Sequence, residues 1–278
     1  MISLEIILPL RYNKKIMKKN LLLILIVVLV ALSLRAQDFK VIHVNGNIVV
    51  ESTQKSLVRG NAFKASEQFL YKSNNAKAVV VNTKIGKRYI LKGDAGSTYR
   101  KVNLIPSMNN ISSRGGALNN RLDLKNHFQG EYVILDALKA KINSQVFPMD
   151  DSHFFYIRYL YKGEQISKKL NYNKDTLIID KESLLKVDGK PILNEDITDM
   201  ELFYYSKDGE NVTSSLISSS FYPVFPDNNN LKEEVEILIS TLKNKDKDYV
   251  IEQIAGYISE VYGKPNKENI KSWYERNF

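Results

Sequence analysis

From residue 39 to residue 92, and again from residue 132 to residue 205, the sequence contains apolar runs of about four to eight residues separated by turn residues. Runs of this length that are rich in Val, Ile, Tyr and Phe predict β-strands, and short connections between them predict antiparallel pairing. The runs Phe39–Val44 and Asn47–Glu51 flank Asn45-Gly46, a pair typical of a type I′ turn because both central residues of that turn need positive φ. We therefore expect these two runs to form a hairpin.

A second hairpin is predicted for Ala78–Asn82 and Arg88–Leu91. Together these strands predict a small all-β domain over residues 37–93. Residues 94–126 are rich in Asn, Ser and Gly, which is typical of a linker, and within them Val102–Ile105 is the one candidate for an edge strand.

The first domain carries a spaced series of aliphatic, aromatic and small residues that resembles the FecR-type periplasmic domain. The series is Leu57, Gly60, Phe63, Phe69, Ala76, Ala78, Val80, Gly86 and Leu91. The resemblance implies a β-rich fold. In that family the domain follows a transmembrane helix and passes an outer-membrane transport signal to a sigma factor. Because no cytoplasmic segment precedes the domain in this sequence, we expect the fold without that role. The overall order of segments also resembles uncharacterised exported proteins of Gram-negative bacteria.

A second β domain is predicted for residues 127–226. Tyr132–Leu135 is typical of a buried strand, and Phe154–Tyr161 has apolar side chains on both faces, which favours a central strand. Met200–Tyr205 continues the antiparallel series, and the spacing of the strands is typical of a β-sandwich.

Tyrosines in these strands are the candidate binding residues. Flat rings with a polar tip could form a stacking platform for a glycan or an extended peptide. The alternative is that they are ordinary strand residues, because strands are enriched in aromatic side chains. The candidates are Tyr156, Tyr159, Tyr161, Tyr204 and Tyr205.

Residues 227–278 predict about three short helices. Apolar residues recur at helical spacing in Leu231, Val235, Leu238 and Leu242, and again in Ile251, Ile254, Ile258 and Val261. We expect Asp248 to cap the second helix and Asn266 the third. The expected fold is therefore mainly β with a C-terminal helical segment, which either packs on its own protein or serves as a docking module.

Residues 1–36 have the parts of a secretory signal peptide. Lys18-Lys19 precedes the aliphatic run Leu21–Leu34, and Ala36 precedes a polar, extended segment. Residues 1–16 fit no part of a signal, so Met17 is the alternative start to Met1. We expect cleavage after Ala36; a retained anchor is the alternative, and only then would the protein be attached to the membrane.

Charge and cysteine content narrow the function. Residues 1–36 hold six basic residues and one acidic residue, so the rest of the chain carries about +4 of the net +9, with its lysines scattered among acids. This distribution argues against nucleic-acid binding, which needs a clustered basic face. The chain has no Cys, so an exported form has no disulfides and is stabilised by packing and strand pairing.

The sequence shows no catalytic constellation and no metal or cofactor motif. His43, His127 and His153 are far apart, and each is interpreted as a surface or edge residue rather than a ligand. Asp150-Asp151-Ser152-His153 contains the residue types of a hydrolase triad, but sequence neighbours cannot adopt triad geometry, so we interpret it as an Asp-rich turn.

These observations favour a non-catalytic exported protein of the periplasm or cell envelope that binds another envelope protein or a glycan. One alternative is an exported hydrolase whose site assembles from distant residues, which would show a pocket with convergent ionisable groups. Another is a membrane-tethered sensor that keeps Leu21–Leu34 as its anchor.

Overall fold

A computed structural model of the 278-residue chain describes residues 38–93, 100–101, 104–106 and 116–278. The predicted signal peptide, its cleavage site and most of the predicted linker lie outside the described residues. The fold is mainly β with antiparallel sheets and a C-terminal helical segment, as the sequence predicted. None of the helices in the described ranges is long and apolar enough to cross a membrane.

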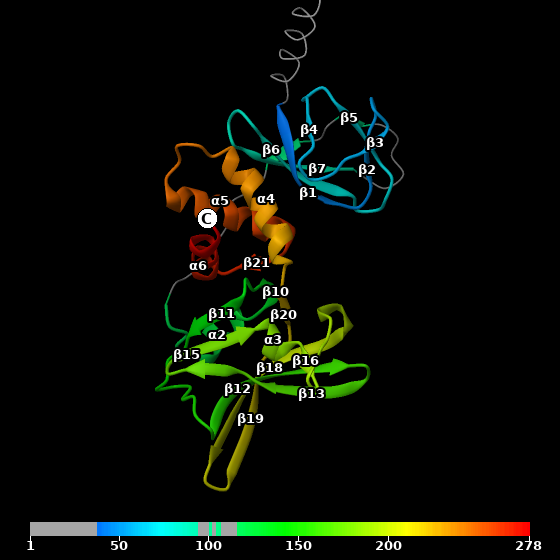
Figure 1. The fold of residues 1–278 in the computed structure, drawn as a ribbon. Coiled ribbons are helices and arrows are strands. Elements are labelled where there is room, and N and C mark those ends of the chain that lie inside the picture. Colours follow the sequence, from blue (N-terminus) through cyan, green and yellow to red (C-terminus); the bar gives the residue numbers. More distant parts are fainter. Residues whose placement is uncertain (1–37, 94–99, 102–103, 107–115) are drawn as a thin grey trace, which may run out of the picture.

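The first β unit consists of two sheets that enclose one core (Figure 1). One sheet has the order β4-β1-β6-β7-β9 and the other the order β3-β2-β5-β8. Its strands are β1 (Phe39–Asn45), β2 (Ile48–Val50), β3 (Lys55–Ser56), β4 (Ala62–Phe63), β5 (Gln68–Tyr71), β6 (Lys77–Asn82), β7 (Arg88–Lys92), β8 (Arg100–Lys101) and β9 (Leu104–Pro106). The core includes Phe39, Phe63, Phe69 and Val80.

The hairpin predicted around Asn45-Gly46 is wrong. β1 pairs with β4 and β6, whereas β2 pairs with β3 and β5, so the chain changes sheets at this point. Gly46 has φ +79°, but Asn45 does not have the positive φ of a type I′ turn. The Ser73 hydroxyl accepts from the Asn47 amide at 2.7 Å, and a Cβ on Gly46 would lie 2.5 Å from that hydroxyl. Tertiary packing at a corner between sheets therefore uses the glycine.

The second predicted hairpin is confirmed. β6 and β7 pair antiparallel, with Val79 opposite Ile90. β6 is buried along most of its length because the first core lies on one of its faces and the helical segment on the other. β9 extends β7 as an edge strand, close to the position predicted within the linker.

The second β unit contains a four-stranded antiparallel sheet in the order β13-β12-β18-β19. As predicted, Phe154–Tyr161 lies in a central strand. A three-stranded sheet, β11-β15-β14, packs on the same core. The strands are β11 (Ala137–Lys141), β12 (His153–Tyr161), β13 (Glu164–Lys169), β14 (Asn171–Asn173), β15 (Thr176–Asp180), β16 (Lys186–Val187), β17 (Lys190–Pro191), β18 (Ile197–Asp208) and β19 (Asn211–Ser218). The short helices α2 (Arg121–His127), α3 (Lys181–Leu184) and η2 (Asn194–Asp196) complete the unit.

A small parallel sheet joins the second β unit to the helical segment. β10 (Gly130–Val133) lies between β20 (Phe221–Val224) and β21 (Lys264–Pro265) and runs parallel to both. Gly263, with φ +124°, allows β21 to approach, because a Cβ there would lie 2.5 Å from the Glu131 carbonyl oxygen. The antiparallel pattern of the sequence did not predict this sheet.

The C-terminal segment forms three helices, as predicted: α4 (Asn228–Ser240), α5 (Lys247–Val261) and α6 (Lys267–Asn277). Asn266 caps α6, as expected. The predicted Asp248 cap is wrong, because the N-cap is Asp246, two residues earlier, and its side chain accepts from the Tyr249 amide at 2.8 Å. Asp248 instead lies in the first turn, where its carboxylate interacts favourably with the helix dipole.

The helices pack between the two β units (Figure 1). Their apolar faces share one core with Ile42, Val79 and Val81 of the first unit and with Val133 and Leu135 after the linker. Of the two expectations for this segment, the structure therefore shows packing on its own protein.

Candidate functional site

A pocket of about 510 Å³ lies where the first β unit meets α4. We call it the β1–α4 pocket. Its lining residues come from β1 and the corner after it, from the β3 region, and from the helical segment: His43, Val44, Gly46, Asn47, Ile48, Ser56, Leu57, Val58, Arg59, Asn230, Glu234 and Tyr262. This volume is in the range of sites that hold small ligands or the end of a larger one.

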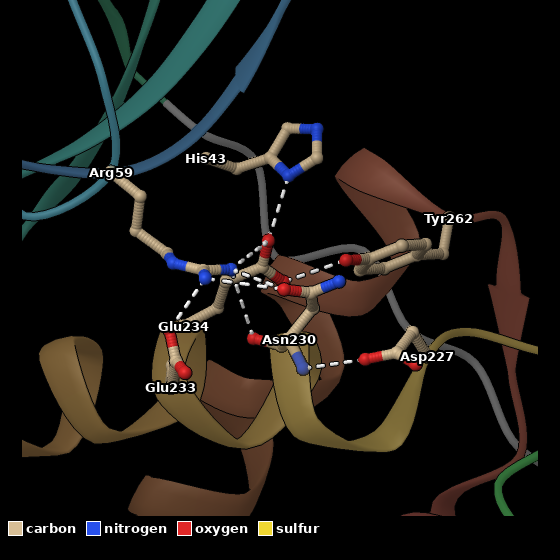
Figure 2. Close-up of polar contacts among 7 residues, drawn as sticks. All are labelled: His43, Arg59, Asp227, Asn230, Glu233, Glu234 and Tyr262. Carbon is tan, nitrogen blue, oxygen red and sulfur yellow. Dashed lines mark hydrogen bonds and ion pairs between the residues drawn. The ribbon is translucent and has the colours of Figure 1, made fainter.

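Glu234 is the centre of the polar groups in this pocket (Figure 2). Its side chain is 3% exposed, and each carboxylate oxygen accepts a hydrogen bond. His43 Nδ1 donates to Oε1 at 2.9 Å, and the Tyr262 hydroxyl donates to Oε2 at 2.7 Å. A buried carboxylate is costly unless such partners satisfy it, so these two bonds hold Glu234 in place.

Arg59 supplies the positive charge of the pocket. Its Nη1 lies 3.8 Å from Glu234 Oε1, and both of its terminal nitrogens donate to Asn230 Oδ1 at 3.2 Å. Its Nη2 also pairs with Glu233, which is largely exposed. Figure 2 shows the guanidinium between the strand side and the helix side of the pocket. Arg59 therefore links the first β unit to α4 and leaves part of its side chain accessible.

The start of α4 positions this group. The Asp227 side chain accepts from the Asn230 amide at 2.9 Å and so fixes the first turn. Asn230 and Glu234 are four residues apart and share one face of the helix, which is directed at β1. The N-cap therefore sets the helical register that brings Glu234 to His43.

Two tyrosines of the helical segment adjoin Glu234. Burial, together with the neighbouring Glu234 carboxylate, raises the pKa of Tyr262 well above its ordinary value. Burial is also the main reason that the pKa of Tyr257 is raised, and the charge of Glu234 adds to it. The Tyr257 hydroxyl is buried and makes no hydrogen bond of ordinary geometry within the described residues. Both phenols therefore stay protonated, and Tyr262 acts as a donor.

The geometry gives His43 a defined orientation. Because a carboxylate only accepts, Nδ1 carries the proton of the bond to Glu234, and Nε2 points away from this contact (Figure 2). The imidazole also packs edge-on against the Tyr262 ring, with the ring centres 5.9 Å apart. The pocket thus offers a positioned imidazole, a guanidinium, an amide and a hydroxyl beside the aliphatic side chains of Val44, Ile48, Leu57 and Val58.

The five tyrosines selected from the sequence do not share one surface. Tyr159 and Tyr204 lie in the core of the second β unit, where their hydroxyls donate to the carbonyls of Leu184 and Pro148. Tyr161 packs against the same core. Tyr156 and Tyr205 lie on the opposite, outer face of the sheet, as the period of two along a strand requires.

On that outer face the rings stack on one another. Tyr156 lies parallel to Phe203 at 5.1 Å, and Phe154 stacks on Tyr205 at 4.7 Å. The Arg158 guanidinium covers Phe203 at 4.3 Å. The ring faces that cover each other in these two stacked pairs are not open to a sugar.

The other two histidines have separate roles. Burial, and then the charge of Lys264, lowers the pKa of His127 to about 4. His127 is half-buried, and its Nε2 bonds the Tyr132 hydroxyl at 2.9 Å. His153 contacts Asp150 and Asp208, whose hydrogen bonds raise its pKa. Asp150 Oδ1 also accepts from the amides of Ser152 and His153, which confirms the Asp-rich turn.

Sequence reasoning missed Arg59, Glu234 and Tyr262. One signal was present for Glu234, which is three residues after Leu231 and one before Val235, on the apolar stripe of α4. A carboxylate on a buried stripe needs a partner, and that requirement points to a polar site. No sequence signal identifies Arg59 or His43 as the partners.

Among the described residues, no group of three or more His, Asp or Glu side chains is placed to hold a metal ion. Compared with known protein families, with curated proteins and with solved structures, the chain matches none.

Proposed function

We propose that this protein is a non-catalytic exported binding module of the periplasm or cell envelope, and that the β1–α4 pocket holds part of an envelope protein or glycan. The observation that carries the proposal is the pocket of about 510 Å³, in which His43, Arg59 and Glu234 converge from three separate segments. A FecR-like fold of the first β unit and export by the signal in residues 1–36 are parts of the same proposal.

The character of the lining supports binding of a polymer segment. Hydrogen-bonding groups from Asn47, Ser56 and Arg59 lie beside aliphatic side chains, a mixture that suits both a peptide and a sugar. The groups around Glu234 are already bonded to one another, so a ligand meets a preorganised wall and does not have to order it.

Site-specific photo-crosslinking in the envelope tests the proposal. A benzophenone side chain at Val58, which is 52% exposed and lines the pocket, should form one defined adduct. The matched control is Ile85, which is 66% exposed and does not line the pocket. The adduct should be lost when Ser56→Trp fills the pocket. Equal adducts at both positions, or an adduct that survives the Ser56→Trp substitution, would contradict it.

An exported hydrolase is the second candidate, and the His43–Glu234 bond favours it. A carboxylate that accepts from Nδ1 of a histidine and leaves its Nε2 free is the arrangement of the second and third members of a catalytic triad. Ser56 supplies an aliphatic hydroxyl in the same lining. Turnover of activated esters that disappears in both Ser56→Ala and His43→Gln, but persists in Ser73→Ala, would favour the hydrolase over the binding module.

The membrane-tethered sensor remains a third form of the proposal, because Leu21–Leu34 lies outside the described residues. Mass spectrometry of the N-terminus of the protein isolated from cells distinguishes the forms. A chain that starts at Gln37 is cleaved and free, whereas one that keeps Leu21–Leu34 is tethered.

A further inference from the structure

The four-stranded sheet of the second β unit has two edges of different character. The β13 edge carries Glu164, Lys168 and Lys169 among six residues, whereas the β19 edge, NVTSSLIS, carries no charge in eight. Charged side chains, lysine above all, are the usual protection of an exposed edge against pairing with another strand. The β19 edge lacks this protection, and its hairpin with β18 extends away from the rest of the molecule (Figure 1).

The register identifies the backbone groups that β19 leaves open. Asp208 pairs with Asn211 across the two-residue turn, so the bonded pairs continue at Ser206 with Thr213 and at Tyr204 with Ser215. The amides and carbonyls of Val212 and Ser214 therefore point away from β18. Side chains from Asn211 to Ser214 are exposed.

Further along the same edge, Arg121 of α2 occupies a backbone hydrogen-bonding position of β19. The Leu216 carbonyl, which points outward in the same series, accepts from Arg121 Nη2 at 2.5 Å. Ile217 and Ser218 are buried. The open part of the edge is therefore the segment Asn211–Ser215, with Glu210 at one end and Arg121 at the other.

We propose that a second copy of this chain pairs antiparallel with this open segment, about a two-fold axis through Thr213. This register places Val212 opposite Ser214 of the second copy, and each such pair exchanges two backbone hydrogen bonds. Thr213 then meets its own equivalent at the close, non-bonded position. The two sheets join into one continuous sheet.

Charge complementarity favours a second copy over an unrelated strand. In this register Glu210 lies opposite Leu216 of the second copy, next to the Arg121 that holds the Leu216 carbonyl. Opposite charges therefore meet at both ends of a segment that is otherwise uncharged, so self-pairing brings no like charges together. Val212 and Leu216, which are 56% and 37% exposed, come from the same face and are partly covered in the joined sheet.

Cysteine cross-linking of the full chain, purified after expression with its own leader, tests the register. The chain has no Cys of its own, so the background is clean. Thr213→Cys should form an intermolecular disulfide with oxidised glutathione, because opposite Cα atoms at a non-bonded pair are about 4.5 Å apart. Ser215→Cys is the matched control, because its equivalent is offset by four residues, or about 13 Å, and cannot be bridged.

Val212→Pro, added to Thr213→Cys, should abolish the cross-link. Its amide points away from β18, so the substitution removes two of the four bonds between copies and leaves the hairpin bonds intact. Unchanged circular dichroism shows that the fold is kept, and sedimentation over a concentration series should show a dimer that the proline variant lacks. Cross-linking of Thr213→Cys no faster than of Ser215→Cys, or a monomer at every concentration, overturns the proposal and leaves the edge for a strand of another protein.

Discussion

Replacing Glu234 by Ala removes the acceptor that joins His43 of β1 to Tyr262 after α5. A hydrogen bond to a charged group contributes about 1.5–3 kcal/mol, and Glu234 accepts two of them. Water can enter from the adjoining pocket and replace part of the hydrogen bond that His43 loses. We therefore expect a loss of about 3 kcal/mol in the free energy of unfolding. For a domain of this size that corresponds to a fall of about 6–12 °C in Tm.

The single tryptophan makes the measurement direct. Trp273 is fully buried in the same core as α4, and its Nε1 donates to Asn228 Oδ1 at 2.6 Å, at the start of that helix. Its fluorescence during urea unfolding therefore follows the helical segment. Glu234→Gln keeps the shape and one acceptor, and we expect it to cost about 1 kcal/mol.

Glu233→Ala is the matched control. Glu233 is the neighbouring carboxylate and also pairs with Arg59, but its side chain is 61% exposed, so its removal should cost less than about 1 kcal/mol. A Glu234→Ala variant that unfolds within about 0.5 kcal/mol of Glu233→Ala would show that the buried carboxylate does not hold the first β unit to the helices, and the argument from its two bonds would fail.

Three further predictions concern titration and capping. Asp150 and Asp208 raise the pKa of His153 in the folded protein. The stability that this contact adds is therefore present below about pH 6.5 and is lost as the pH rises through the folded-state pKa. In an NMR titration, Asp208→Asn should lower the pKa of His153. His127, with a pKa of about 4, is neutral in the folded protein at neutral pH. Its contribution to stability should fall as the pH drops from about 6.5 towards 4, because the unfolded chain then binds a proton that the folded protein does not. A pKa near 6.5 in an NMR titration would disprove its burial. In urea unfolding, Asp246→Ala should lower the free energy of unfolding by about 1 kcal/mol, and Asp248→Ala should lower it clearly less. The reverse order would show that Asp248 is the cap, as the sequence predicted.

Local patterns predicted the elements well where one face of a strand or helix decides its conformation. The apolar run Phe154–Tyr161 predicted the strand β12, and the apolar stripe from Leu231 to Leu242 predicted α4. The hairpin at Asn45-Gly46 failed because a turn signal states only that the chain bends. Whether the next strand joins the same sheet depends on packing against residues such as Ser73, which are distant in sequence.

The site was harder to predict than the fold because its residues come together only through contacts between segments that are distant in the sequence. His43, Arg59 and Glu234 are 16 and 175 residues apart in the sequence, and no local motif links them. The strands of the parallel sheet, β10, β20 and β21, begin at residues 130, 221 and 264. They are likewise distant in the sequence, so no local pattern predicts that they pair. The tyrosines were easy to select because aromatic strands are conspicuous, but the period of two sends Tyr159 and Tyr204 to the core.

The two-residue strand β21 has a consequence for the order of events during synthesis. β10 is complete at Val133, yet one of its two neighbours is contributed by Lys264-Pro265, about 130 residues later in the sequence. A polypeptide that emerges from its amino end therefore keeps one side of β10 without a partner until these two residues have been added. We expect chains released before this point to remain targets for proteases, and the addition of Lys264-Pro265 to be the event that completes the parallel sheet.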